Sequence, residues 1–171
     1  MGRILRHSIF YLAAILLVGF AACNSDEGCE GNTSSMPLAG FYSSQTKKAI
    51  TIDSLTVFGV GVPNDSLLLD TAQASQTYFP LDIEKMQARF VIRYDQQQLA
   101  ALNLADTITI DYSPRPYFHS EECGAMYYFD VKGYRTTNVL IDSMQIITPV
   151  FDNTTAETIK IYFRTGADEQ Q

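Results

Sequence analysis

Short runs of alternating apolar and polar residues, broken by Gly, Pro, Asn and Asp, fill the chain after Met36. Alternation with a period of two is typical of β-strands, whose successive side chains point to opposite faces of a sheet. In the run 88–95, Phe90, Ile92 and Tyr94 fall on one face and two arginines on the other. This pattern predicts an all-β domain.

About eight strands are expected. The runs that carry the pattern are 50–58, 66–70, 77–81, 88–95, 106–112, 125–131, 139–148 and 158–163. Segment 96–104 is interpreted as one short helix, with a loop as the alternative. Many runs recur at roughly 8–12-residue spacing, which is typical of an antiparallel sandwich or barrel. Large apolar residues on the inward faces favour a β-sandwich, immunoglobulin-like or of a related Greek-key type, over residues 36–165. Residues 166–171 are expected to form a disordered tail.

The beginning of the chain has the pattern of an export signal. Two arginines within the first six residues precede the uncharged apolar stretch Ile9–Ala22. This stretch is shorter than the roughly 20 residues that a membrane-spanning helix needs, so residues 1–22 are predicted to be a signal peptide. The segment Phe20-Ala21-Ala22-Cys23 resembles the lipobox of bacterial lipoproteins, in which the cysteine receives acyl chains such as palmitate. An ordinary secretory leader, with Cys23 incidental, is the alternative.

Lipid on Cys23 would anchor the chain to a bilayer. Each buried methylene contributes about 0.8 kcal/mol, and stable anchoring takes more than one acyl chain, which the lipobox implies. The acidic segment Asn24–Glu27 resembles the surface-export signal of lipoproteins in Bacteroides-like bacteria, and a solvated tether over residues 23–35 is the simpler interpretation. The predicted location is the cell envelope, as an outer membrane lipoprotein with a periplasmic or surface-exposed domain.

The charge of the chain narrows the range of partners. The formal net charge is −7, and it becomes more negative once the two leader arginines are removed. An acidic domain repels phosphate backbones, so no nucleic-acid partner is expected. The expected partners are the lipid bilayer, through acylated Cys23, and an unknown envelope protein or glycan.

The chain has three cysteines. If Cys23 carries lipid, Cys29 and Cys123 remain, and an exported compartment permits them to form a disulfide. Chain-entropy reasoning gives about 4–5 kcal/mol as an upper estimate of the stabilisation by so long a loop. Two buried free thiols are the alternative. A redox site is disfavoured because the chain has no C-x-x-C motif.

Several segments stand out beyond the strand pattern. They are Met36-Pro37-Leu38, Phe41-Tyr42, Asp53-Ser54-Leu55-Thr56-Val57-Phe58-Gly59-Val60-Gly61, Asp65-Ser66-Leu67-Leu68, Phe79-Pro80-Leu81 and Glu122-Cys123-Gly124. Together they resemble a family of small uncharacterised lipoproteins from Bacteroides-like bacteria, known as a domain of unknown function. The resemblance covers most of the chain after the leader and implies an exported β-rich lipoprotein. It implies no activity and no catalytic residue.

The sequence contains few of the residue patterns that catalytic sites require. His119 is the one histidine after the leader, and Ser120 and Cys123, the nucleophiles nearest to it in sequence, stand in no G-x-S-x-G motif. The segment 119–123 lacks the ligand spacing of a zinc motif, and no phosphate-binding glycine loop or dinucleotide fingerprint is present. We therefore predict that the protein is not an enzyme and holds no cofactor or metal. A hydrolase based on carboxylates that pair in space is the remaining enzymatic alternative.

Aromatic residues crowd one region of the chain. They are Tyr112, Tyr117, Phe118, Tyr127, Tyr128, Phe129 and Tyr134. Packing within the fold is one interpretation, and a binding surface is the other. Pro114-Arg115-Pro116 predicts a rigid exposed loop, so the candidate ligand or partner contacts are Arg115, Tyr117, Phe118 and His119. The binding interpretation requires the rings of Tyr117 and Phe118 to be exposed.

Five segments repeat the order Asp, hydroxyl residue, apolar residue. This order resembles the O-glycosylation acceptor motif of exported proteins in Bacteroides-like bacteria. The candidate acceptors are Ser54, Ser66, Thr71, Thr107 and Ser143. Turn chemistry is the alternative, because Asp and Ser commonly initiate turns.

These features together predict a membrane-anchored β-domain that binds or scaffolds another envelope component without catalysis. A module that binds a glycan or small ligand is the alternative function, and the carboxylate-based hydrolase ranks behind both.

Overall fold

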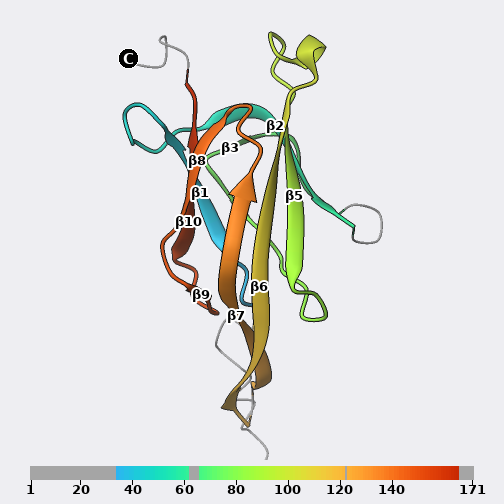
Figure 1. Ribbon diagram of the computed structural model, residues 1–171, viewed down its shortest axis with the longest axis vertical. Coiled ribbons are helices and arrows are strands. Elements are labelled where there is room, and N and C mark those ends of the chain that lie inside the picture. Colours follow the sequence, from blue (N-terminus) through green and yellow to red (C-terminus); the bar gives the residue numbers. More distant parts are fainter. Residues whose placement is uncertain (1–33, 62–65, 122, 166–171) are drawn as a thin grey trace, which may run out of the picture. The chain divides into compact units, whose positions relative to one another are not determined.

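The structure is a computed structural model that describes residues 34–61, 66–121 and 123–165. The chain divides into two compact units, Met1–Glu30 and Gly31–Gln171, and every described residue belongs to the second. This unit is an all-β sandwich (Figure 1). Its elements are β1 (Leu38–Ser43), β2 (Ile52–Val60), β3 (Leu67–Ala74), β4 (Gln76–Tyr78), β5 (Gln87–Tyr94), the 3₁₀ turn η2 (Ala100–Leu102), β6 (Ala105–Ser120), β7 (Gly124–Thr136), β8 (Ile141–Ile146), β9 (Val150–Phe151) and β10 (Glu157–Phe163).

The strands form two sheets in the described part of the chain. The smaller sheet has the order β4-β1-β10-β8, and the larger has the order β3-β2-β5-β6-β7-β9. Every neighbouring pair is antiparallel except β1 and β10, which are parallel. Parallel neighbours need a long connection, and here the rest of the domain provides it. The first and last strands therefore lie side by side in the centre of one sheet.

The core lies between the two sheets and follows the predicted alternation. Three strands each bury three alternate side chains with at most 3% of their surface exposed. These are Phe90, Ile92 and Tyr94 of β5, Ile108, Ile110 and Tyr112 of β6, and Ile159, Ile161 and Phe163 of β10. The rings of Tyr94 and Phe163 meet edge to face across the sheets, with their centroids 6.3 Å apart. The prediction of an all-β sandwich is confirmed.

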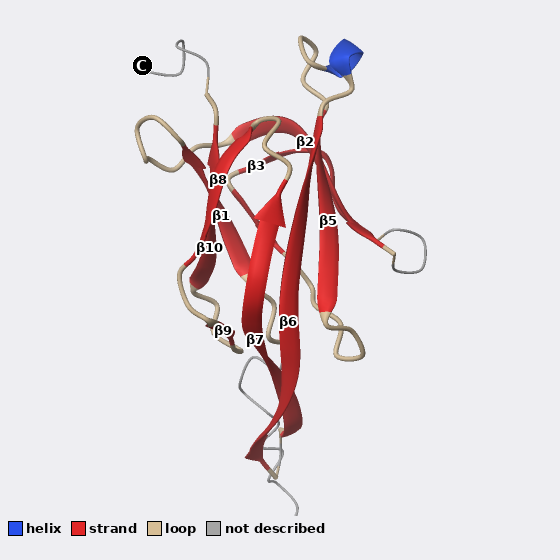
Figure 2. Cartoon of the chain, viewed as in Figure 1, coloured by secondary structure: helices blue, strands red, loops and turns tan. Residues whose placement is uncertain are grey.

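The helix expected over 96–104 is wrong. This segment contains only the 3₁₀ turn η2, the coiled segment in Figure 2. None of the three residues of η2 is buried, and Asn103 ends the turn in the left-handed conformation, at φ 48°. Leu99 and Leu104, on either side of η2, pack against the core, but a stable helix needs a longer apolar face than these two side chains provide. None of the helical segments formed by the described residues could cross a membrane.

The loop expected at Pro114-Arg115-Pro116 is also wrong, because these residues continue β6 and pair with β7. The backbone N–H of Tyr112 donates to the backbone carbonyl of Met86, which lies just before β5. The N–H of Tyr112 therefore points toward the β5 side of β6. Since N–H groups alternate sides along a strand, residues 114 and 116 face the edge that β7 leaves open. Proline lacks an N–H, so it is tolerated at these positions and blunts the free edge against another strand.

One buried carboxylate links the two sheets. Asp106 at the start of β6 is fully buried, and its oxygens accept five hydrogen bonds of 2.7–3.0 Å. The donors are the hydroxyls of Tyr94 and Thr137 and the backbone N–H groups of Val139, Leu140 and Ile141. Burial and the neighbouring Asp106 raise the pKa of Tyr94, so this hydroxyl stays a donor. Asp106 thereby fixes the turn that carries the chain from β7 in one sheet to β8 in the other.

Candidate functional site: an aromatic arm

The β6–β7 hairpin runs past the end of the sandwich, at the bottom of Figure 1. β5 pairs with β6 as far as Asp111. From Ser113 onward, β6 has β7 as its one strand partner within the described residues. We call residues 113–121 and 123–130 the arm. Among the strands that the structure describes, only β9 lies beside the arm, at its base, where it pairs with Phe129 and Asp130.

One face of the arm is held by a ladder of side chains. The rings of Tyr117 and Tyr128 stack at 4.7 Å with an interplanar angle of 16°. The guanidinium of Arg115 lies 5.8 Å from the centre of the Tyr128 ring, and its Nε lies 3.3 Å from a carboxylate oxygen of Asp130. The Tyr128 hydroxyl donates to the side-chain oxygen of Asn153 at 3.4 Å. Cross-strand contacts of this kind stabilise a two-stranded ribbon.

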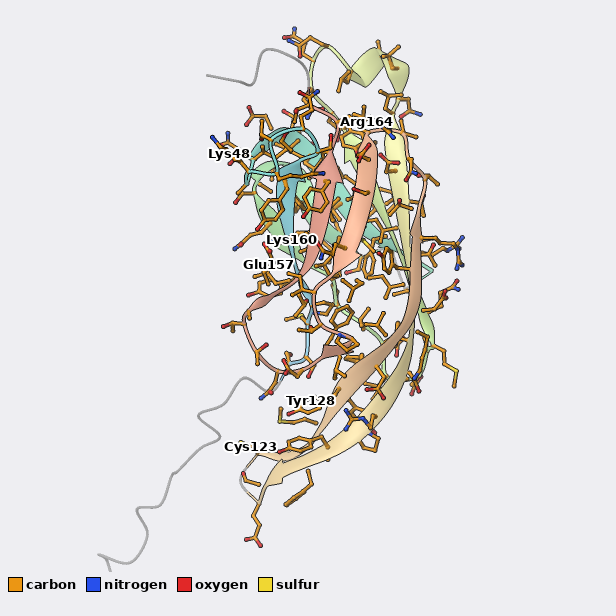
Figure 3. All side chains as sticks on the ribbon, turned by 60° about the vertical axis from the view of Figure 1, so that its left-hand side comes forward. Lys48, Cys123, Tyr128, Glu157, Lys160 and Arg164 are labelled. Carbon is orange, nitrogen blue, oxygen red and sulfur yellow. The ribbon has the colours of Figure 1, made fainter. Side chains whose placement is uncertain are left out.

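The position of Tyr128 ties this ladder to the sandwich. Tyr128 lies on the arm, as Figure 3 shows, and Asn153 follows β9 in the chain. Partial burial, together with Tyr117 and Asp152, raises the pKa of Tyr128. Its hydroxyl therefore remains protonated and remains a hydrogen-bond donor at neutral pH.

The other face of the arm is apolar and exposed. The register pairs Pro116 with Tyr127 and Phe118 with Ala125, so these four side chains share one face. All four residues are exposed, Phe118 by 65% and Tyr127 by 37%. We call them the tip patch. Clustered exposed apolar side chains on a rigid element are typical of an interaction surface.

The structure separates the four predicted contact residues. The rings of Tyr117 and Phe118 are 38% and 65% exposed, as the binding interpretation requires. Strand alternation nevertheless places Arg115 and Tyr117 on the ladder face and Phe118 on the opposite face. His119 belongs to β6, and its side chain lies outside the described part of the structure. The packing interpretation holds for the base of the arm, where Tyr112 and Phe129 are buried.

Sequence reasoning missed the contribution of β7 to the tip patch. Ala125 and Tyr127 lie within a segment that was predicted as a strand, but its partner was expected to be a loop. Pro114 and Pro116 could have indicated a strand. They stand two residues apart, so both lie with the position of the missing N–H on the same side of a strand, which suits an open edge. A hairpin that turns near residues 121–123 places Tyr127 opposite Pro116.

The cysteines fall partly outside the described residues. The signal peptide, Cys23, Cys29 and the tether as far as residue 33 are not among them. Cys123 follows the turn of the arm, and its N–H donates to the Ser120 hydroxyl at 3.1 Å. The pairing of Cys29 with Cys123 stays a prediction. In the described part of the chain, no three His, Cys, Asp or Glu side chains gather in a way that could hold a metal ion.

The five candidate glycosylation sites differ in their exposure. Ser66 and Thr71 are exposed, whereas Ser54, Thr107 and Ser143 are half-buried. Thr107 follows Asp106, whose carboxylate is fully occupied inside the fold. An enzyme that reads the aspartate would need to act there before folding, while Ser66 and Thr71 remain accessible afterwards. Modification at any of these sites stays a prediction.

A model of a family of unknown function (DUF6452) matches residues 54–163. The matched region begins within β2 and ends with β10, so it includes the arm. No curated protein and no solved structure matches the chain.

Proposed function

The chain belongs to the DUF6452 family, whose function is unknown, and we propose that it is an envelope lipoprotein that binds another envelope macromolecule through the tip patch. In this proposal acylated Cys23 anchors the chain to the outer membrane, and the β-domain acts without catalysis. The observation that carries the binding role is the exposed pair Phe118 and Tyr127 on a braced arm. The leader and the lipobox-like segment support the anchor.

The bracing of the arm supports binding on energetic grounds. A patch on a pre-organised element loses little conformational freedom when a partner binds. The stacked pair Tyr117–Tyr128 and the Arg115–Asp130 ion pair hold the ladder face, which leaves the tip patch free to make contacts. Aromatic side chains are enriched among the residues that contribute most to interface affinity.

The chemistry of the tip patch supports side-chain recognition. Pro114 and Pro116 blunt the open edge of β6, so an added strand would find few donors there. The patch consists of one proline, one alanine and two aromatic rings, so its contact surface is mainly apolar. The arrangement therefore suits a partner with an apolar surface that covers the rings.

Photo-crosslinking in intact cells tests this role. With benzoylphenylalanine in place of Phe118, we expect one discrete adduct, because the side chain at this position is 65% exposed on the patch. The same residue in place of Leu67, which is 56% exposed on β3, is the matched control and should give no such adduct. The adduct at position 118 should decrease at least tenfold with Tyr127→Ser.

A second control separates the patch from general surface stickiness. Tyr78 on β4 is 41% exposed, close to the 37% of Tyr127, and lies outside the arm. Tyr78→Ser should leave the adduct unchanged. Equal adducts from positions 118 and 67, or an adduct that survives Tyr127→Ser, would contradict the proposed role of the tip patch.

A glycan partner is the second candidate function. Exposed aromatic rings stack against the apolar faces of sugars, and Phe118 and Tyr127 are such rings. Binding of the purified domain to a glycan array, lost in Tyr127→Ser and kept in Tyr78→Ser, would favour this function over a protein partner.

The anchor and the disulfide are tested by intact mass spectrometry of the protein from native membranes. We expect a chain that begins at Cys23, carries two or three acyl groups and lacks two hydrogens because Cys29 and Cys123 are bonded. Reduction should restore the two hydrogens and leave the acyl mass in place. A mature chain without acyl mass would overturn the lipoprotein assignment.

A further inference from the structure

The outer face of the smaller sheet carries two tyrosines side by side. Tyr42 of β1 and Tyr162 of β10 are register partners, and the centroids of their rings lie 5.7 Å apart. The neighbouring Phe41 and Phe163 are buried in the core, so strand alternation places both tyrosine rings on the solvent side of the sheet. The pair therefore forms part of the outer surface of the sandwich.

A lysine lies over each of these rings. The ammonium of Lys160 is 4.9 Å from the centre of the Tyr42 ring, and that of Lys47 is 4.5 Å from the centre of the Tyr162 ring. Attraction between a cation and the face of a ring restricts where a long, flexible side chain places its charge. We call Tyr42, Lys47, Lys160 and Tyr162 the lysine–tyrosine cluster.

Within the described residues, neither lysine of the cluster forms an ion pair. This part of the chain has ten lysines and arginines, of which five pair with an aspartate. Three of the other five are Lys47, Lys48 and Lys160, and Figure 3 places Lys48 and Lys160 on the same side of the sandwich. The whole chain has 19 acidic residues against 12 basic ones, so carboxylates are plentiful. The cluster nevertheless keeps its positive charge.

The carboxylate that borders the cluster is bound by one of the tyrosines. Glu157 at the start of β10 accepts from the Tyr42 hydroxyl, with both of its oxygens at 2.9 Å. Gly40 permits this contact, because a Cβ atom at that position would collide with the Glu157 carboxylate. Burial and the neighbouring Glu157 raise the pKa of Tyr42, so its hydroxyl stays protonated and adds no negative charge. Positive charge therefore exceeds negative charge on this face.

We propose that the lysine–tyrosine cluster binds an acidic glycan, whose carboxylates lie beside Lys47 and Lys160. Complementary charge favours an anionic ligand at this surface. Next to Lys160 in the register, Gln145 of β8 accepts from the Tyr162 hydroxyl at 3.4 Å. These amide and hydroxyl groups suit the hydroxyls of a sugar, which both donate and accept. The tip patch lies on a different hairpin, so either proposal can fail without the other.

The acidity of the whole chain favours a glycan over nucleic acid or a bilayer. The formal net charge is −7, and its repulsion is strongest for a ligand with densely spaced charges. A glycan with a carboxylate on every second sugar carries far fewer charges. Lysines in direct contact with it still attract it, because screening acts only beyond about 8–10 Å. Segments that bind anionic bilayers have about 4–8 basic residues, more than this cluster provides.

A matched pair of oligosaccharides tests the proposal. One is the hyaluronan octasaccharide, which has a carboxylate on every second sugar, and the other is the same octasaccharide with its carboxylates reduced to alcohols. The protein is the mature chain, residues 23–171, with Cys23→Ser so that no lipid is attached. We expect the acidic form to bind roughly tenfold more tightly, as measured by isothermal titration calorimetry. Added salt should weaken this binding.

Three variants locate the binding site. Lys47→Gln combined with Lys160→Gln should weaken binding of the acidic octasaccharide roughly tenfold. Arg89→Gln combined with Lys132→Gln is the matched control, since it removes the same charge from exposed residues of the larger sheet, and it should bind as the parent chain does. Glu157→Gln keeps an acceptor for Tyr42 and removes the negative charge, so it should strengthen binding. Misfolding could not produce such a gain.

The proposal is overturned if neither octasaccharide binds, if both bind equally, if the two double variants bind alike, or if Glu157→Gln weakens binding. It is also overturned if the chain binds vesicles of phosphatidylglycerol and not the acidic octasaccharide, because the partner would then be a bilayer. Tyr127→Ser alters only the tip patch and should leave this binding unchanged. Loss of binding in that variant would place the glycan on the arm and not on the cluster.

Discussion

Asp106→Ala is expected to lower the free energy of unfolding by about 3–5 kcal/mol, comparable to the loss of one partner from a buried charged network. The carboxylate is fully buried and accepts five hydrogen bonds. Three of its donors are backbone N–H groups of residues 139–141, which no side-chain substitution can remove. With alanine at position 106, these three N–H groups either stay buried without an acceptor or reach water by opening the turn between β7 and β8.

The matched control is another aspartate on the same strand. Asp111 forms an ion pair with Arg135 at 2.9 Å, but the side chain of Arg135 is 61% exposed. Exposed pairs contribute about 0–1 kcal/mol, so Asp111→Ala should have a small effect. Both variants are measured by urea unfolding of the mature chain. Equal losses of stability would contradict the role of Asp106.

Asp106→Asn removes the negative charge of this side chain and keeps its shape. Asparagine keeps nearly the same volume, but its NH₂ group would face the donors that now point at the carboxylate. We expect most of the loss seen with Asp106→Ala to persist in this variant. The reason is that the site is built from donors, so only a group that accepts on both of its oxygens satisfies it.

The sequence predicted the sandwich because its strands follow the simplest rule. Phe90, Ile92 and Tyr94 alternate with Arg89, Val91 and Arg93, and each of the three is buried as a period of two requires. This rule needs no knowledge of the neighbouring strand. The order of the strands is a different matter, since the parallel contact of β1 with β10 joins residues from opposite ends of the domain.

The features missed by the sequence reasoning depend on neighbours that a single segment does not reveal. Pro114 and Pro116 suit a loop as well as an open strand edge, and only the start of β5 at Gln87, which pairs with Asp111 of β6, decides between them. Asp106 stands in the same Asp-Thr order as the candidate glycosylation motif. Its true role appears only when the turn 139–141 folds over it.

The candidate site could be predicted in part for the same reason. Exposure of Tyr117 and Phe118 was a condition that the sequence could state, and the structure meets it. Which residues share the exposed face depends on the register of β6 against β7, and this register contains an irregularity next to Tyr112. One extra residue in a strand changes which side chains face outward.

Loss of the proposed Cys29–Cys123 bond is expected to lower the free energy of unfolding by about 2–4 kcal/mol. The bond would close a loop that contains every strand from β1 to β6. Its main effect is to restrict the unfolded chain, whose entropy falls when distant residues are joined. In a Cys23→Ser background, reductant and Cys123→Ser should each produce the loss, and the two together should add nothing further.

The location of Cys123 sharpens this prediction. It follows the turn of the arm, at the opposite end of the domain from Arg164 (Figure 3). If the bond acts on the unfolded ensemble, its reduction should shift the urea midpoint and leave the folded sandwich as it was. The circular dichroism spectrum of the folded chain should then be the same with and without reductant. A midpoint that reductant does not move would contradict the bond. A spectrum that changes on reduction, before the domain unfolds, would instead show that the bond shapes the native state.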